Sequence, residues 1–312
     1  MTMKDSRSRW AGVLPLAALL AAGLGAGPAS ASPVVAPTGA QQVTAACKMP
    51  VGSVTAAGDH YIREYTATSP PSMTGETRGL LATFLDAGMA GSMVKEPVAA
   101  GSRYSGWMVF GNVMWAVSYE IDAQNKPIAG TTKTARVGGG WDGYSYFETS
   151  RTTTRTNQYA LRSDGTLLRW TMSGGTWAAK VSAPGFSSVR AMALISQTSA
   201  YDTFLATTRG GALYSVRVPT TGAFKPVVKL VGAAGSRWEK PINLVAERCG
   251  QYGTLLLGID RNGQNAEMFA IGHVNGTATV INELHWVDGE FADPVYFRMT
   301  GRPDLTPPLN GE

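Results

Sequence analysis

The chain has 312 residues and a formal net charge of +5 at pH 7. Lys4, Arg7, Arg9 and Asp5 contribute +2 of that charge, and the remaining +3 is too weak to indicate a surface that binds nucleic acid. The chain has only three histidines and two cysteines, which are few ligands for a zinc-type metal site.

Residues 1–31 have the organisation of a secretory signal peptide. Basic residues precede an apolar run over 11–24, and Ala29-Ser30-Ala31 supplies a small-x-small cleavage signal. The run is too short and too rich in alanine and glycine for a membrane anchor. We therefore expect a secreted protein with no anchor, and a leader of this composition is typical of a high-GC bacterium.

Residues 32–46 are expected to form a flexible arm, with order beginning at Cys47. Cys47 and Cys249 are the only cysteines, and an even count in an exported chain favours a disulfide. That bond would close a loop of about 200 residues, for which the chain-entropy model gives a few kcal/mol of stabilisation. Two unpaired buried thiols are the alternative.

Residues 77–90 are the one segment with helical spacing. Leu80, Leu81, Phe84 and Leu85 would share one helix face, and Gly88 would end the helix. A loop or a strand is the alternative for this segment.

The rest of the chain consists of short β-prone runs separated by turn residues. The clearest is 158–170, in which Asp164-Gly165 predicts a hairpin with a two-residue type I′ turn. Similar hairpins are expected over 113–130, 203–216 and 254–272.

A glycine-containing turn followed by an aromatic residue repeats out of phase with the hairpins. These aromatics are Tyr104, Trp141, Phe186, Trp238 and Phe291, spaced by 37, 45, 52 and 53 residues, with Tyr61 as a degraded first copy. A unit of this length with a central hairpin matches one four-stranded propeller blade.

The sequence therefore predicts an all-β domain over 47–304, a β-propeller of about five four-stranded blades, followed by a tail over 305–312. Six blades, or a β-sandwich with long loops, are the alternatives. In a ring, a Cys47–Cys249 disulfide would lock the start of the domain to its last part.

Two segments resemble the tachylectin-type five-bladed β-propellers. They are ALRSDGTLLRWTMSGGTW (160–177) and LATTRGGALYSVRVPTTGAFKPVVKL (205–230), in which a strand, a glycine turn, a second strand and a glycine–aromatic step follow one another. The resemblance implies a non-enzymatic carbohydrate-binding propeller with ligands held between neighbouring blades.

Aromatic residues beside polar ones are the candidate ligand-binding positions, because an aromatic face stacks on a sugar while polar groups bond its hydroxyls. The candidates are Trp141, Asp142 and Tyr144, then Arg237, Trp238 and Glu239, then Arg103 and Tyr104. The alternative is that each aromatic packs between blades.

No motif for a metal, a cofactor or a nucleophilic triad is found, and the Asp260–Asn265 segment is better explained as an Asn-Gly turn than as a calcium loop. Residues 151–155, RTTTR, are expected to guard an exposed β edge, with a small anionic-ligand patch as the alternative.

The expected partner is a glycan or an extracellular protein. A secreted propeller that binds or inhibits another protein is one alternative function. A glycoside hydrolase on the same scaffold is the other, because five acids fall near equivalent early-blade positions. They are Asp59, Asp142, Asp202, Glu247 and Asp293.

Overall fold

A computed structural model describes residues 46–81 and 83–312. The predicted signal peptide and all but the last residue of the predicted arm lie outside the described residues. The described part is built of strands, apart from the single turn of helix α1 (Ser236–Glu239). It contains no helix of the length and hydrophobicity that a membrane span requires.

Three sheets each contain four antiparallel strands that follow one another in the chain. The first consists of β9 (Tyr144–Arg151), β10 (Thr156–Arg162), β11 (Leu167–Ser173) and β12 (Thr176–Ala183). The second consists of β13 (Val189–Gln197), β14 (Tyr201–Thr208), β15 (Leu213–Pro219) and β16 (Val227–Gly232). The third consists of β17 (Asn243–Cys249), β18 (Gly253–Asp260), β19 (Asn265–Ile271) and β20 (Ile281–Trp286).

The remaining nine strands form one sheet with two parts. One part consists of β21 (Val295–Gly301), β1 (Lys48–Val54), β2 (His60–Thr66) and β3 (Ser72–Arg78). The other consists of β4 (Ala87–Ala90), β5 (Met93–Val98), β6 (Gly101–Phe110), β7 (Val113–Asp122) and β8 (Lys133–Gly139). The parallel pair of β21 and β5 joins the two parts.

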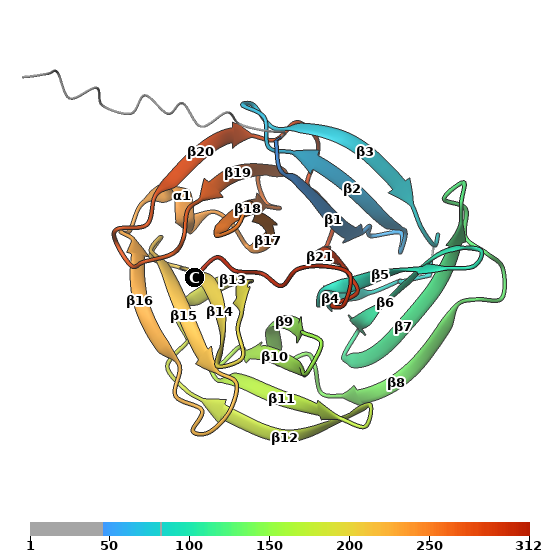
Figure 1. Ribbon diagram of the computed structural model, residues 1–312, viewed down its shortest axis with the longest axis horizontal. Helices are drawn as coiled ribbons and strands as arrows, with labels where there is room; N and C mark the ends of the chain where they lie inside the picture. Colours follow the sequence, from blue (N-terminus) through green and yellow to red (C-terminus); the bar gives the residue numbers. More distant parts are fainter. Residues whose placement is uncertain (1–45, 82) are drawn as a thin grey trace, which may run out of the picture. The chain divides into compact units, whose positions relative to one another are not determined.

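The sheets are arranged around a common centre (Figure 1), with β21, β4–β5, β9, β13 and β17 innermost and β3, β8, β12, β16 and β20 at the periphery. Apolar side chains from facing sheets fill the space between them, so the core is a series of clusters rather than one layer. This is the architecture of a β-propeller, and it differs from the two facing sheets of the alternative sandwich.

The helix predicted over 77–90 is wrong. β3 ends at Arg78, an irregular segment follows, and β4 begins at Ala87. The buried Phe84 stacks on Phe110 with ring centroids 5.6 Å apart. Contact with the neighbouring sheet therefore outweighs the local helical spacing.

The hairpin at 158–170 is confirmed as β10–β11, but its turn is not the predicted two-residue type I′ turn. Only Gly165 has a positive φ, of 84°, and its N–H donates to the carbonyl of Arg162 at 2.9 Å. Ser163, Asp164 and Gly165 thus form a three-residue loop with glycine in the left-handed position. Arg209, Gly210 and Gly211 form the same loop between β14 and β15, where Gly211 has φ 76°.

The repeated aromatic residues pack at the junction of each sheet with the next. The N–H of Phe186 donates to the carbonyl of Gly165, at 2.9 Å, in the turn between the second and third strands of the preceding sheet. Equivalent contacts are Phe84 N–Gly58 O, Trp141 N–Asn112 O, Gly235 N–Gly211 O beside Trp238, and Phe291 N–Gln264 O. All five aromatic side chains are buried. Because Phe84 makes the contact with the preceding turn, the first copy of the repeat is Phe84 and not Tyr104 or Tyr61.

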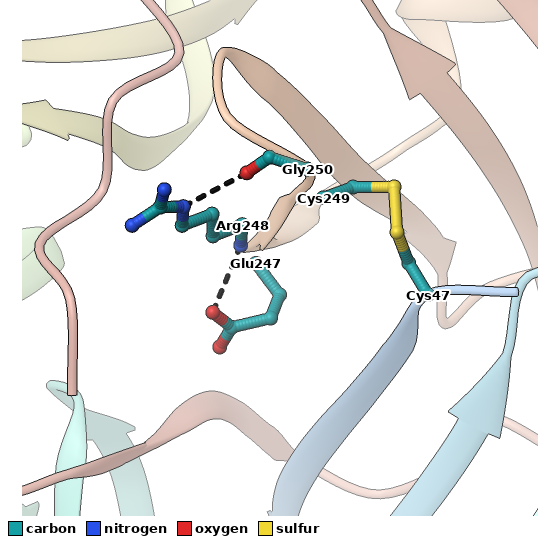
Figure 2. The surroundings of a disulfide bond; sticks show 5 residues. All are labelled: Cys47, Glu247, Arg248, Cys249 and Gly250. Atoms are coloured by element: carbon teal, nitrogen blue, oxygen red, sulfur yellow. Dashed lines mark hydrogen bonds between the residues drawn. A yellow bond between two sulfur atoms is a disulfide. The ribbon is translucent and has the colours of Figure 1, made fainter. Parts of the chain in front are cut away.

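Two contacts connect the beginning of the described chain to its end. Residues Val51–Val54 of β1 pair with Val295–Arg298 of β21. The predicted disulfide between Cys47 and Cys249 is present and joins the start of β1 to the end of β17 (Figure 2).

The segment predicted as a tail, residues 305–312, crosses the middle of the ring in Figure 1. Leu309 is buried, and its carbonyl accepts from the N–H of Gln197. The carboxylate of Glu312 accepts hydrogen bonds from Thr203 and Arg217 at 2.5 and 3.0 Å. These contacts fix the segment against β13, β14 and β15.

Candidate functional site

Trp141, the central residue of the first predicted site, lies in an aromatic cluster and not on the surface. Its ring centroid is 4.7 Å from that of Tyr144, 5.5 Å from Phe147 and 5.8 Å from Trp177. Trp141 is buried, Tyr144 is half-buried and Asp142 is exposed. This placement favours packing over binding for Trp141, because its faces are already covered.

Arg103 and Tyr104 are neighbours on β6 and point to opposite sides of the strand. Arg103 is exposed and pairs with Glu96 and Glu120 at 3.3 and 2.6 Å. Tyr104 is buried and stacks on Tyr119, and the Lys95 ammonium lies over its ring, 5.8 Å from the ring centroid. The two side chains therefore do not converge on one ligand.

The third predicted group lies on helix α1. Trp238 is buried against Phe269, with ring centroids 4.7 Å apart, while Arg237 and Glu239 are exposed. Of these three residues, Arg237 lines a surface cleft.

That cleft, which we call the Trp286 cleft, lies between the β16–β17 connection and the β17–β20 sheet. It has a volume of about 180 Å³ and is lined by Arg237, Lys240, Pro241, Gly258, Asp260, Asn265, Glu267 and Trp286. Trp286, at the end of β20, is 51% exposed. An exposed indole beside two cations, two acids and an amide is the arrangement that sugar sites use.

The polar groups of the cleft are positioned by the β18–β19 turn. Asp260 Oδ1 accepts the N–H groups of Asn262 and Gly263, both at 3.1 Å. Asn265 donates to the carbonyl of Gly263 at 2.9 Å, while its buried Oδ1 has no partner among the described residues. The turn therefore fixes the positions of Asp260 and Asn265 in the lining of the cleft.

A carboxylate pair adds a titratable group to the cleft. Burial raises the pKa of Glu267 to about 7, assisted by a hydrogen bond to Glu283 and by the charge of that neighbour. The same hydrogen bond, together with Arg237, lowers the pKa of Glu283. Glu267 therefore takes up a proton as the pH falls through about 7, and the protonated carboxyl donates to Glu283.

Replacement of Glu267 by glutamine is expected to change the pH dependence of stability. The pKa of Glu267 is about 7 when folded and 4.5 as its ordinary value, so its stabilising effect is full below 4.5 and is lost as pH rises through 7. Glutamine cannot ionise and still donates to Glu283. Because the site is half-exposed, we expect Glu267→Gln to melt about 2–4 °C above the wild type at pH 8 but not at pH 5.

Thermal melts from pH 5 to pH 8 test this expectation. The exposed Glu290→Gln is the control for loss of one negative charge. Parallel melting curves for the wild type and Glu267→Gln across this range would contradict it.

Sequence reasoning missed Trp286, Lys240 and Asn265 as site residues. The predicted aromatics directly follow glycine turns, and aromatics at those positions pack between sheets. Trp286 instead ends an outermost strand just before the turn at Gly289. An aromatic at the end of a peripheral strand, near a polar Asn-Gly turn, is the signal that would have found it.

The acids proposed for a hydrolase do not occupy equivalent places. Glu247 lies on the inner strand β17 and Asp202 on the second strand β14, whereas Asp142 and Asp293 precede inner strands. Asp202, Glu247 and Asp293 each pair with an arginine, and Asp59 pairs with Arg78. The predicted equivalence of these five acids is therefore wrong.

A cavity of about 110 Å³ lies on the axis and is lined by residues of β4, β9, β13, β17 and β21. We call it the axial cavity. Glu148 is the one carboxylate among its described lining residues. Its Oε1 accepts the N–H groups of Ser92 and Thr149 at 2.7 and 2.6 Å. Glycosidases need two carboxyl groups about 5–10 Å apart, and this cavity does not present such a pair.

The histidines are separated in the structure. His60 is fully buried among aromatic rings, 2.5 Å from the hydroxyl of Tyr119, and burial lowers its pKa to about 3. It is therefore a neutral core residue. Across the described ranges, no three His, Cys, Asp or Glu side chains group as a metal site would require.

No family model and no curated protein matches the chain. Solved structures with a similar fold include the Aleuria aurantia lectin in complex with α-methyl-L-fucoside, at 14% identity and a TM-score of 0.44, covering 78% of each chain. The same lectin is described as a six-bladed β-propeller.

Two further similar structures have different activities in their names. The SapL1 lectin in complex with α-methyl fucoside has 10% identity and a TM-score of 0.38, covering 76% of this chain and 79% of that one. The catalytic domain of the Coprinopsis cinerea GH62 α-L-arabinofuranosidase has 13% identity and a TM-score of 0.41, and the match covers 59% of this chain and 64% of that one. Similarities this distant assign neither ligand nor activity to this chain.

Proposed function

We propose that this chain is a carbohydrate-binding protein that acts without covalent chemistry, and that its ligand site is the Trp286 cleft. The observation that carries the proposal is the half-exposed indole of Trp286 in a cleft with Arg237, Lys240, Asp260 and Asn265. The indole would stack on the apolar face of a pyranose, and the polar groups would bond its hydroxyls.

The layout of acids supports binding over hydrolysis. Glu267 and Glu283 interact through a hydrogen bond, whereas the two carboxyl groups of a glycosidase stand apart on either side of the scissile bond. The axial cavity presents Glu148 alone among its described lining residues.

The full chain is expected to bind at least one glycan on an array, and Trp286→Ala is expected to weaken that binding roughly tenfold or more, because a stacked aromatic is a typical binding hot spot. Tyr252→Ala is the matched control, because Tyr252 is 47% exposed but stacks on His273 outside the cleft. Affinities of the two variants would be compared by calorimetry on the best glycan.

Three results would contradict this proposal. They are the absence of any bound glycan, equal binding by Trp286→Ala and the wild type, and hydrolysis of the bound glycan by the full chain. Circular dichroism of each variant would exclude unfolding as the reason for lost binding.

We further infer a ring of five blades closed by β21. The packing of an aromatic residue on the preceding turn occurs at Phe84, Trp141, Phe186, Trp238 and Phe291, once for each group of strands, and β21 supplies the inner strand next to β1. Export under the signal peptide over 1–31 completes the proposal of a secreted binding protein with a glycan as its partner.

A further inference from the structure

The axial cavity has polar atoms that the fold itself does not use. It lies at the end of the axis where the innermost strands begin, with Tyr146 near the start of β9, Arg190 near the start of β13 and Asn243 at the start of β17. It shares no lining residue with the Trp286 cleft.

Four residues that line this cavity each have one buried side-chain polar atom with no hydrogen-bond partner among the described residues. These atoms are Tyr146 Oη, Arg190 Nε, Asn243 Oδ1 and Arg261 Nε. A buried polar group that is left unpaired destabilises the folded state. Three of these atoms are donors. A 180° rotation of the Asn243 side-chain amide would put its NH₂ group, a fourth donor, in the place of its oxygen.

The charges on the wall are unbalanced in the positive direction. Arg190, Arg261 and Arg298 face one carboxylate, Glu148, whose Oε1 is already bonded to backbone N–H groups. Arg298 pairs with Glu247 at 3.1 Å. Arg261 donates to the carbonyl of Pro294, and Arg190 has no ion pair or hydrogen bond in the described chain.

We propose that the axial cavity binds a small oxyanion, a phosphate or carboxylate group, through Arg190, Arg261 and Tyr146. Guanidinium groups bind such anions through two parallel hydrogen bonds. Burial keeps the pKa of Tyr146 well above its usual range, so its hydroxyl stays protonated and donates. A cavity of about 110 Å³ holds several waters, or one such group in their place.

Thermal melts of the full chain in sodium phosphate and in sodium chloride of equal ionic strength test the proposal. Phosphate is expected to raise the wild-type melting temperature by several degrees, because a ligand of the folded state alone stabilises it. Arg190→Gln and, separately, Arg261→Gln are expected to abolish this rise. Arg209→Gln, an exposed arginine of the β14–β15 turn, is expected to retain it.

Glucuronate and glucose, added in place of phosphate, identify the source of the anion. A rise with glucuronate but not with glucose, lost in Arg190→Gln, would show that the cavity takes a sugar carboxylate. A rise with phosphate alone would show that it takes a free inorganic anion. Either result supports the proposal.

A structural role for Arg190 gives a different pattern in chloride. Because its charge has no partner, Arg190→Gln is expected to be at least as stable as the wild type without the anion. The proposal is overturned by a lower melting temperature of Arg190→Gln in chloride, by an undiminished rise in phosphate, or by no effect of either anion on the wild type.

Discussion

Replacement of both Cys47 and Cys249 by serine is expected to lower the free energy of unfolding by about 3–5 kcal/mol, because the disulfide restricts the unfolded chain. The bond spans 202 positions of sequence, with Cα atoms 5.5 Å apart, so it closes a loop that includes most of the described chain. The strand pairs between β1 and β21 do not depend on it, and the folded ring should therefore persist.

Urea unfolding followed by tryptophan fluorescence would measure this change. The control is the wild type in a reductant, which should unfold at the midpoint of the double serine variant, whereas the variant itself should not respond to the reductant. Equal midpoints for the oxidised wild type and the variant would show that the bond adds no stability.

The sequence was informative about the β architecture because the turn chemistry is local. Asp164-Gly165 and Gly210-Gly211 mark their hairpins, since glycine alone adopts φ 84° and 76° without strain. The Cβ of any other residue at Gly211 would also lie 2.4 Å from the carbonyl oxygen of Gly235. A turn that excludes side chains in this way requires glycine, and that glycine can be recognised in the sequence.

The order of the strands was less predictable because it depends on contacts between distant residues. β21 joins β1 although about 240 positions separate them in the chain. The first repeat was misplaced for a similar reason, since Phe84 lies in a segment with helical spacing and is held by the N–H contact to Gly58. The spacing of apolar residues within a short segment cannot show a contact with a residue outside that segment.

The candidate site was the least predictable part. Trp141, Trp238 and Trp286 are equally aromatic in the sequence, but they are 6%, 5% and 51% exposed. Only the position of β20 at the periphery of its sheet leaves Trp286 accessible. Arg237 adjoins the repeat residue Trp238 in the sequence, but in the structure it pairs with Glu283 and lines the same cleft as Trp286.

The arginines of residues 151–155 show the same limit of local reasoning. The segment was expected to guard an exposed edge, with an anionic-ligand patch as the alternative. Arg155 instead pairs with the fully buried Asp202, through Nη1–Oδ2 at 2.7 Å and Nη2–Oδ1 at 2.6 Å. This pair connects the β9–β12 sheet to the β13–β16 sheet.

Arg155→Ala is accordingly expected to destabilise the protein by about 3–5 kcal/mol, because it leaves a buried carboxylate without its cation. Ser150 and Tyr159 would remain as donors to Asp202, at 2.8 and 2.7 Å, but both are neutral. A lower urea midpoint, with an unchanged dependence of the unfolding free energy on urea concentration, would show that Arg155→Ala lowers stability.

Two further variants distinguish the effect of an unpaired buried carboxylate from the effect of removing an arginine side chain. Arg162→Ala removes an exposed pair with Asp164, in which the side chains are 48% and 49% exposed, and should cost no more than about 1 kcal/mol. The double variant Arg155→Ala/Asp202→Asn should be more stable than Arg155→Ala alone, because asparagine leaves no unpaired charge in the core. If the double variant is instead the less stable of the two, Asp202 contributes through its other hydrogen bonds and the ion pair is not what joins the two sheets.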